Sequence, residues 1–381
     1  MSEARTLFVS SFPPVLGGGR AVRTYTCIRA LAMLGPLDLA YVEHDGEGPS
    51  PEYRAIEGVT FHRIEASRGA RRAGLYLSKR LQAVPKKCCR GTSPELVDTA
   101  VRLASEPGRG RVIAGDMAAA VAFLPDAARR PFVYNAHNVE SEYVDRDVKL
   151  RRLAFATMRR FERRLLLAAS ESWMVSQTDI RSAQRLAPAA HLRYVPNVVD
   201  VGAIVPRDPA AARAGDGPPT LLMVGDFHYL PNVSGLEMLV ESVLPLVWQR
   251  EPRARLRVVG RGLDAWRAPD ARVQVEGFVE DLAPCYEQAD CVVVPLTEGA
   301  GTPLKFVEAL AYGVPIVATP LAAKGLQVTP DVHYRSGADA QGFADSIMRN
   351  LSDDAAELGR NARLLAEREY SIEALAKAVA A

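Results

Sequence analysis

Short runs of apolar, often β-branched residues alternate with longer helical patterns along this chain. In its first half these runs predict buried strands at residues 7–11, 37–41, 59–63, 111–114 and 132–134. Between them, apolar residues recur at helical spacing, as in the stretch that ends at Gly35-Pro36. Strands that alternate with helices are typical of a parallel sheet covered by helices, so the pattern predicts an α/β fold.

The same alternation begins again after a change in composition. Residues 206–219 are rich in Pro, Ala, Gly and Asp, which is typical of a linker. Beyond them the pattern predicts strands at 221–224, 256–259, 273–276 and 291–295, with a helical pattern over 351–381. A chain of 381 residues is long enough for two domains, each with its own core.

A predicted strand, a glycine-containing loop and a helix follow one another over residues 291–315. Thr302 can cap the helix, and Pro303 suits its first position because an N–H is not needed there. Gly313 is expected to end the helix. This geometry directs backbone N–H groups and the positive end of the helix dipole toward an anion.

Lys305 and Glu308 strengthen the prediction of an anion site. A lysine in the first turn of a helix is disfavoured by the dipole by up to about 1 kcal/mol, which a bound phosphate would offset. Glu308 follows three residues later, so both side chains leave the same side of the helix. The pair suits the diphosphate and the ribose hydroxyls of a nucleotide. The alternative is an ordinary lysine–glutamate pair on a helix surface.

The run GTPLKFVEALAYGVPIVATPLAAKGL, residues 301–326, resembles the donor-binding motif of glycosyltransferase family 4. These group 1 glycosyltransferases are retaining enzymes of the GT-B fold, so the resemblance implies two Rossmann-like domains that face a central cleft. The implied limits are an acceptor domain at 1–198 and a nucleotide-sugar donor domain at 199–365. Residues 366–381 are then a helix that crosses back to the first domain.

The resemblance implies a metal-independent transfer of a sugar from a nucleotide sugar to an acceptor hydroxyl. No resident cofactor is expected, and the co-substrate is a UDP-, GDP- or dTDP-linked sugar. The acceptor is a sugar, a lipid-linked molecule or a small molecule. Two alternatives remain: a nucleotide-sugar epimerase of the same fold, which uses no acceptor, and a protein that binds without turnover.

The donor residues of the family are carried over to matching positions, with two departures. A second family Glu falls at Ala300, so Glu298 is the candidate replacement, and an Arg of the subgroup is replaced by Pro303. The cations that the family places after the first strand of the donor domain are missing from residues 224–232, where His228 is the only candidate helper. The predicted donor-binding residues of this half are Gly225, Asp226, Glu298, Gly301, Thr302, Lys305 and Glu308.

Two features of the first half join the predicted site through the resemblance. Gly18 and Gly19 lie between the first strand and the first helix, where the family brings backbone amides to the diphosphate. The spacing G-x-G-x-x-G is absent, so a plain tight turn is the alternative. His137 follows strand 132–134, where parallel sheets bind ligands and where the family places a His beside the donor sugar. We therefore predict His137 and Lys305 as catalytic residues; a structural role is the alternative for His137.

Residues 68–90 form the most basic segment, with eight cations and no acidic residue between Glu65 and Glu95. Four apolar side chains interleave with the charges: Leu75, Tyr76, Leu77 and Leu81. Such a segment is most often a solvated face. The alternative partner is an anionic membrane surface, while no nucleic-acid motif accompanies the charges.

Composition limits the remaining possibilities. The net charge of +2 gives no preference for polyanions, and five cysteines without CxxC or metal-ligand spacing are typical of a reducing cytoplasm. The sequence Asp145-Arg-Asp147 resembles a metal–diphosphate motif, but charges at a helix N-terminus explain it better, so no metal site is predicted. The N-terminal pattern predicts a strand instead of a signal peptide, and no apolar run reaches membrane-spanning length. The expected location is cytoplasmic, with peripheral membrane contact as the alternative.

Overall fold

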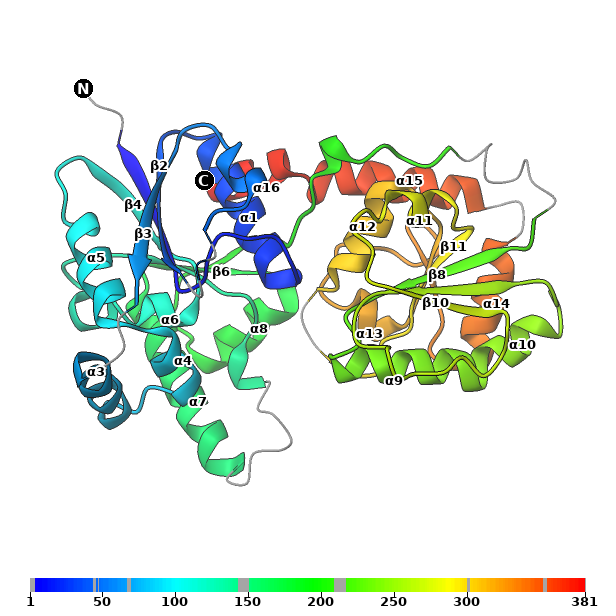
Figure 1. The fold of residues 1–381 in the computed structure, drawn as a ribbon, viewed down its shortest axis with the longest axis horizontal. Helices are drawn as coiled ribbons and strands as arrows, with labels where there is room; N and C mark the ends of the chain where they lie inside the picture. The colour runs from blue at the N-terminus through cyan, green and yellow to red at the C-terminus, as the bar shows by residue number, and fades with distance from the viewer. Residues whose placement is uncertain are drawn as a thin grey trace. The chain divides into compact units, whose positions relative to one another are not determined.

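The computed structural model describes residues 4–43, 46, 48–66, 70–142, 151–208, 217–299, 302–351 and 355–380 (Figure 1). Its contacts divide the chain into two units, Met1–Pro196 with Leu375–Ala381, and Asn197–Ala374. The first domain limit predicted from the sequence, 198/199, stands two residues after this division, 196/197. Asp145 and Asp147 lie outside the described residues, as do Arg68, Ala300 and Gly301.

The first unit is built on a seven-stranded sheet in the order β3-β2-β1-β4-β5-β6-β7. Every neighbouring pair is parallel. The strands β1 and β2 are largely buried because both faces of the sheet are covered, which explains the apolar runs in their sequences. The strands are β1 Arg5–Ser10, β2 Leu37–Glu43, β3 Val59–Glu65, β4 Arg109–Ala114, β5 Val133–Asn135, β6 Glu171–Met174 and β7 Leu192–Tyr194.

Helices connect these strands, as the alternation in the sequence predicts. They are α1 Gly19–Ala32, α2 Pro51–Arg54, α3 Ala70–Leu81, α4 Lys86–Gly91, α5 Pro94–Ala104, α6 Met117–Ala120, α7 Arg151–Ala168 and α8 Gln177–Leu186. Short 3-10 turns lie at η1 Leu124–Asp126 and η2 Glu140–Glu142. The parallel crossover connections bring the carboxyl ends of the strands to one edge, where ligands bind in folds of this class.

Arg23 of α1 is buried and ties the helix to the carboxyl edge of this sheet. Its guanidinium donates to the side-chain oxygen of Asn135 at 2.7 Å and to the carbonyls of Val195 and Pro196 at 3.1 and 3.2 Å. Burial lowers the pKa of Arg23, although nearby groups partly offset this. The hydrogen bonds compensate for removing the charge from water and fix the position of α1.

Residues Leu375–Ala381 complete the first unit, although they come from the far end of the chain. Arg193 of β7 donates to the carbonyl of Ala378 at 3.3 Å, and Arg111 of β4 donates to the carbonyl of Val379. The side chains of Leu375 and Val379 are fully buried. These carbonyls belong to the last turn of α16, Ile372–Ala380, so the two arginines satisfy groups that the helix itself leaves without partners.

The second unit contains a six-stranded parallel sheet in the order β10-β9-β8-β11-β12-β13. Figure 1 shows helices on both of its faces, and two separate hydrophobic clusters lie there. The sequence pattern did not predict β12 or β13, which are too short to show a periodicity. The strands are β8 Thr220–Val224, β9 Arg255–Val259, β10 Val273–Gly277, β11 Cys291–Val294, β12 Ile316–Ala318 and β13 Arg335–Ser336.

After β8 the chain forms α9 Leu230–Met238, a π-helical turn η5 Leu239–Val243 and α10 Leu244–Trp248. Pro245 has no N–H to donate to residue 241, which favours the wider turn. Within the described residues, this stretch is the one helix that is long and apolar enough to cross a membrane, and half of the apolar window is buried. Its buried side chains form part of the core beneath the sheet. The other helices are η3 Val201–Ala203 (3-10), α11 Ala283–Glu287, α12 Leu304–Tyr312, α13 Pro320–Ala323, α14 Ala340–Asn350 and α15 Ala355–Glu369.

Candidate functional site

In the second unit, the loops that follow β8 and β9 lie against each other. Gly260 has a φ of +147°, and a Cβ at this position would lie only 1.7 Å from the carbonyl oxygen of Gly225. No side chain fits there, so glycine is required. The close approach brings Asp226 and Arg261 to the same edge of the sheet, since each follows one of these two glycines.

Lys305 reaches this edge from the first turn of α12. Its Nζ donates a hydrogen bond of 2.6 Å to Oδ1 of Asn232, whose Nδ2 in turn donates to the carbonyl of Asp226 at 2.7 Å. A Cβ at Gly225 would lie 3.5 Å from Nζ and 3.1 Å from Nδ2 of Asn232, so the glycine leaves room for both groups. The structure thus brings together Gly225, Asp226 and Lys305, and adds Asn232, which the sequence analysis missed.

The ammonium of Lys305 sits in a setting that disfavours its charge. The side chain of Lys305 is partly exposed, but the protein around its ammonium is dense enough that burial lowers the pKa to about 8. Glu308 acts in the opposite direction and raises the pKa. The positive end of the α12 dipole also disfavours a cation here. A bound anion would reverse the balance, as expected for a phosphate site.

Glu308 is held on the next turn of the same helix. Its Oε2 accepts a hydrogen bond of 3.0 Å from the hydroxyl of Tyr286, whose ring stacks on that of Tyr312 with centroids 4.3 Å apart. Burial raises the pKa of Glu308, while Tyr286 and Lys305 oppose the rise. The carboxylate is therefore fixed in orientation by a rigid aromatic pair.

The N-terminus of α12 differs from the prediction. Pro303 occupies the N-cap position, the helix starts at Leu304, and no side chain of the described residues caps it. The hydroxyl of Thr302 instead accepts a hydrogen bond of 2.8 Å from Nδ2 of Asn197, so the prediction that Thr302 can cap the helix is wrong. Because no side chain occupies the cap, the amides of the first turn are left to other acceptors.

Glu298 and Gly299 form the described part of the loop before α12. Oε1 of Glu298 accepts a hydrogen bond of 3.1 Å from the hydroxyl of Ser234 on α9. Gly299 has a φ of +109°, and a Cβ there would lie 3.0 Å from the hydroxyl of Tyr229. The predicted site residue Gly301 lies outside the described residues, as does Ala300. The family has a Glu at the position of Ala300, and Glu298 is the predicted replacement for it.

Arg261 supplies a cation that the sequence analysis did not identify. Its guanidinium lies 4.1 Å from the ring centroid of Phe278, and its charge helps to lower the pKa of Asp226. Partial burial opposes the lowering of this pKa. Two hydrogen bonds to Oδ1 of Asp226 favour it, one of 3.0 Å from the backbone N of His228 and one of 2.8 Å from its Nδ1. The signal in the sequence was Gly260-Arg-Gly262 directly after a predicted strand. His228 thus contacts Asp226.

In the first unit, His137 lies just beyond the carboxyl end of β5. Its Nε2 is 2.9 Å from the carbonyl oxygen of Gly115, which can only accept, so Nε2 carries the proton. Burial, together with the charges of Arg23 and Arg20, lowers the pKa of His137 to about 3, although the hydrogen bond to Gly115 opposes this. The ring is therefore neutral near pH 7, and its Nδ1 has a lone pair to offer to a hydroxyl donor.

Gly18 and Gly19 form the start of α1. Gly18 is the N-cap with a φ of −67°, and a Cβ there would meet no atom of the described residues within 4 Å. The fold itself therefore does not require glycine at this position. Arg20 lies in the first turn with its guanidinium 3.5 Å from the ring centroid of Phe12, and burial lowers its pKa. Like Lys305, Arg20 is a cation at the positive end of a helix.

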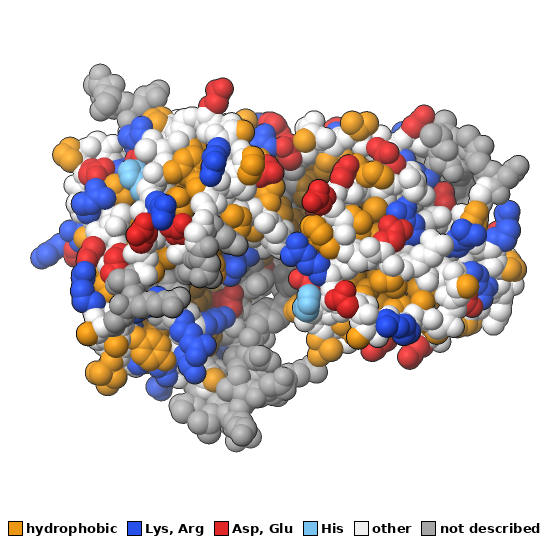
Figure 2. All heavy atoms as spheres, in the orientation of Figure 1, with side chains coloured by type: hydrophobic (Ala, Val, Ile, Leu, Met, Phe, Trp, Pro, Cys, Tyr) orange, Lys and Arg blue, Asp and Glu red, His pale blue; other side chains and the backbone are white. Residues whose placement is uncertain are grey.

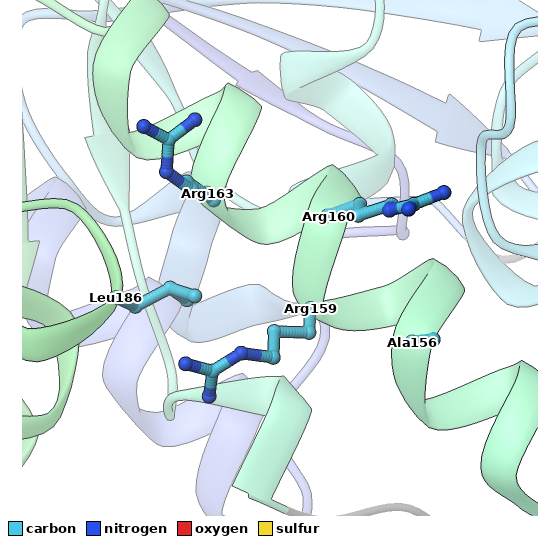
Figure 3. Close-up of a pocket in the computed structure, with 5 residues that line it drawn as sticks. All are labelled: Ala156, Arg159, Arg160, Arg163 and Leu186. Atoms are coloured by element: carbon cyan, nitrogen blue, oxygen red, sulfur yellow. The ribbon is translucent and has the colours of Figure 1, made fainter.

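A hollow of about 330 Å³ lies elsewhere in the first unit, between α7 and α8 (Figure 3). It is lined by Ala156, Arg159, Arg160, Arg163 and Leu186. Figure 3 shows that Arg160 points away from Leu186, whereas Arg159 and Arg163 lie on its side. The three guanidinium groups do not converge on one point, and none of the predicted site residues that the structure describes lines this hollow.

Comparisons with known proteins bear on this arrangement. Residues 218–353 match the family model described as "Glycosyl transferases group 1", a segment that contains the cluster around Lys305. No curated protein matches the chain by sequence.

Three solved structures illustrate the similarity of fold. Sucrose-phosphate synthase from Thermosynechococcus elongatus has a TM-score of 0.73 at 21% identity, over 99% of this chain and 98% of that one. HepE from Anabaena, in complex with UDP and glucose, has a TM-score of 0.71 at 16% identity, again over 99% and 98%. A glycosyltransferase from Rickettsia africae has a TM-score of 0.69 at 12% identity, over 99% and 97%. These similarities confirm the predicted fold class: α/β, with two Rossmann-like domains of the GT-B type.

Proposed function

We propose that this chain is a glycosyltransferase that moves a sugar from a nucleotide sugar to an acceptor hydroxyl. The observation that carries the proposal is the cluster of Lys305, Asn232 and Gly225, because it places a partly desolvated cation beside backbone with no side chain. The match of residues 218–353 to group 1 glycosyltransferases supports it, since the cluster lies within that segment.

The diphosphate of the donor is proposed to lie at this cluster. Lys305 contributes a charge-assisted hydrogen bond, and the amides at the start of α12 contribute oriented dipoles. Arg261 lies at the same edge of the sheet and adds a second cation. These groups are suited to the charge that develops on a leaving diphosphate, so we propose a transfer that needs no metal ion.

Glu308 is proposed to accept hydrogen bonds from the ribose hydroxyls. The contact with Tyr286 holds one carboxylate oxygen and leaves the other to a ligand. HepE of Anabaena is described in complex with UDP-glucose, which makes a UDP-linked sugar the first donor to test. GDP- and dTDP-linked sugars are the next.

The proposed chemistry retains the configuration at the sugar carbon, as the resemblance to family 4 implies. The bond between the sugar carbon and the diphosphate oxygen breaks, and the acceptor oxygen bonds to the same face of that carbon. The acceptor proton passes to the leaving diphosphate oxygen, so no added base is required. The neutral imidazole of His137 is proposed to orient a sugar hydroxyl through Nδ1. We propose a cytoplasmic enzyme, because nucleotide sugars and five reduced cysteines fit that compartment.

A two-stage experiment tests the proposal. Thermal shifts are first measured with UDP-, GDP- and dTDP-linked sugars, since a ligand at 100 times its dissociation constant adds about 2.7 kcal/mol of stability. The donor that stabilises the protein is then incubated with and without candidate sugar acceptors, in the presence of EDTA. We expect nucleoside diphosphate to appear only with an acceptor, and NMR of the product to show the retained anomer.

The other outcomes each point to a different protein. Consumption of the donor without acceptor indicates the epimerase, and stabilisation without any turnover indicates a binding protein. Activity that EDTA abolishes would contradict metal independence alone. If no nucleotide sugar stabilises the protein, the donor site has been misplaced.

A further inference from the structure

Helix α3 exposes two of its leucines on one face. Leu77 and Leu81 are four residues apart, so they lie on the same face, and their side chains are 61% and 81% exposed. Ala73 and Gly74, on the same side, are also exposed. Lys79, by contrast, is only 6% exposed. Two leucines of α3 thus face water while one of its lysines is buried, which is unusual for a surface helix.

The orientation of α3 is held by contacts on its inner side and at its end. Tyr76 packs against the hydrophobic core of the first unit, and the buried ammonium of Lys79 has a lowered pKa from burial and from the charge of Arg164. At the end of the helix, the guanidinium of Arg80 donates to the carbonyl of Val84 at 2.7 Å, and Ala83 adopts a φ of +59°. A left-handed conformation at a residue other than glycine is disfavoured and persists where the surroundings impose it.

Cations surround this apolar face. Within α3 and α4 there is no acidic residue, and the exposed side chains include Arg71, Arg80, Lys86, Lys87 and Arg90. Two of them are paired with acids of other elements, Arg71 with Asp98 at 2.7 Å and Lys87 with Glu140. Figure 2 shows hydrophobic side chains beside Lys and Arg side chains in the region of α3 at the lower left.

We propose that α3 docks this protein on an anionic lipid surface, with its axis in the plane of the interface and Leu77 and Leu81 inserted among the acyl chains. This face has apolar side chains in its middle and cations at its margins. The apolar side chains suit the hydrocarbon of the bilayer, and the cations suit the anionic headgroups above it. Arg80 on the helix and Lys86 and Arg90 on α4 then lie at the level of the lipid phosphates. The inference is independent of the proposed sugar transfer.

Two other occupants fit the surface less well. A second copy of the chain would bring an identical set of cations opposite the first, and like charges repel. A nucleic acid would use the cations but would leave two exposed leucines unburied, and no exposed aromatic ring lies on this face of α3 to stack on bases. A lipid surface uses both the charges and the leucines.

The experiment is sedimentation of the full chain with vesicles at low ionic strength. One set contains phosphatidylglycerol with phosphatidylcholine, and the other contains phosphatidylcholine alone. We expect binding to the first set, weaker binding to the second, and release from the first as salt is added. Leu77→Ser with Leu81→Ser should reduce partitioning about tenfold or more, since each leucine contributes by its buried area. The matched control is Leu364→Ser on α15, a leucine with 62% exposure, which should bind as the parent does.

Three further measurements complete the test. Melting temperatures should be unchanged in the serine variants, because both leucines are exposed. Leu81→Trp should show a blue shift of its emission when anionic vesicles are added, since the indole enters an apolar layer. Equal binding by the serine pair and the parent, equal binding to neutral vesicles, or no binding at low salt would overturn the proposal. A dimer seen in sedimentation velocity would also overturn the proposal if the serine pair abolishes it. The same holds for binding to a polynucleotide that the serine pair abolishes.

Discussion

The ammonium of Lys305 donates a hydrogen bond of 2.6 Å to the side-chain oxygen of Asn232. Both ends of this amide have a suitable partner, because its oxygen accepts from Lys305 and its nitrogen donates to the carbonyl of Asp226. The partner of the lysine is therefore a neutral oxygen that leaves the positive charge available to a ligand. An amide that holds a lysine without neutralising it is an arrangement suited to an anion site.

Lys305→Ala should weaken the binding of nucleoside diphosphate. Loss of a charge-assisted hydrogen bond to phosphate corresponds to roughly 1.5–3 kcal/mol, or about 10- to 150-fold in the dissociation constant. Isothermal titration calorimetry measures it, and Lys324→Ala, an exposed lysine of the same unit, serves as the control. Equal affinity in the parent and Lys305→Ala would place the diphosphate elsewhere.

The affinity for nucleoside diphosphate should fall as the pH rises from about 7 to about 9. Burial lowers the pKa of Lys305 from 10.5 to about 8, so the free protein loses this charge in that range. Lys305→Arg stays protonated, and its affinity should change less with pH. Affinity that is constant across the range in the parent would contradict a role for the ammonium.

The same group also affects stability, with a sign that can be worked out. Between about pH 8 and 10.5 the unfolded chain binds more protons than the folded one at Lys305, so the free energy of unfolding contributed by this group rises with pH. Lys305→Met should lack this rise in urea unfolding. This readout concerns the free protein and does not depend on any ligand.

Glu308→Gln should weaken nucleoside diphosphate but leave pyrophosphate unaffected, since the carboxylate is assigned to the ribose. The expected loss is roughly 1.5–3 kcal/mol for a hydrogen bond to a charged group. Lys305→Ala should weaken both ligands, so the two variants separate the two subsites. Tyr286→Phe, which removes the 3.0 Å hydrogen bond to Glu308, should show a smaller version of the same selective loss. A loss of pyrophosphate binding in Glu308→Gln would refute the assignment.

His137→Ala should lower kcat by about 10²-fold, within the range for a polar group positioned for the transition state. Nucleoside diphosphate should bind to the variant as to the parent. Burial lowers the pKa of the imidazole to about 3, so the acidic limb of the activity profile should not follow an ordinary histidine near 6.5. Unchanged kcat and KM in His137→Ala would return the residue to a structural role.

Gly18→Val should leave the melting temperature close to that of the parent, because among the described residues no atom lies within 4 Å of a Cβ at this position and the φ of −67° suits any residue. If a ligand approaches the backbone here, the added side chain should weaken donor binding or turnover at least several-fold. Gly217→Ala, also without neighbours within 4 Å, is the control. Full activity in Gly18→Val would identify a plain turn.

The sequence predicted the elements whose evidence is local. Strands such as β1 and β11 could be predicted from their continuous apolar runs. Gly313 ends α12 in the expected left-handed conformation, with a φ of +67°. The parallel alternation of strands and helices was enough for the fold class, because few topologies satisfy it.

What the sequence did not predict depends on contacts between distant positions. The hydroxyl of Thr302 is engaged by Asn197, a residue 105 positions away, so its local capping pattern was overruled. Asn232 gains its role only because Lys305 reaches it across 73 positions. The outward face of α3 was also hidden, since periodicity identifies an apolar side but not the direction in which it points.

The inclusion of Leu375–Ala381 in the first unit has a consequence for how the protein is made. The carbonyls that Arg111 and Arg193 bind belong to Val379 and Ala378, so the first unit is incomplete when residue 196 leaves the ribosome. At about 5–20 residues per second, synthesis of the next 183 residues (379 − 196) takes about 10 to 40 seconds. During that interval the surface that later receives α16 is uncovered.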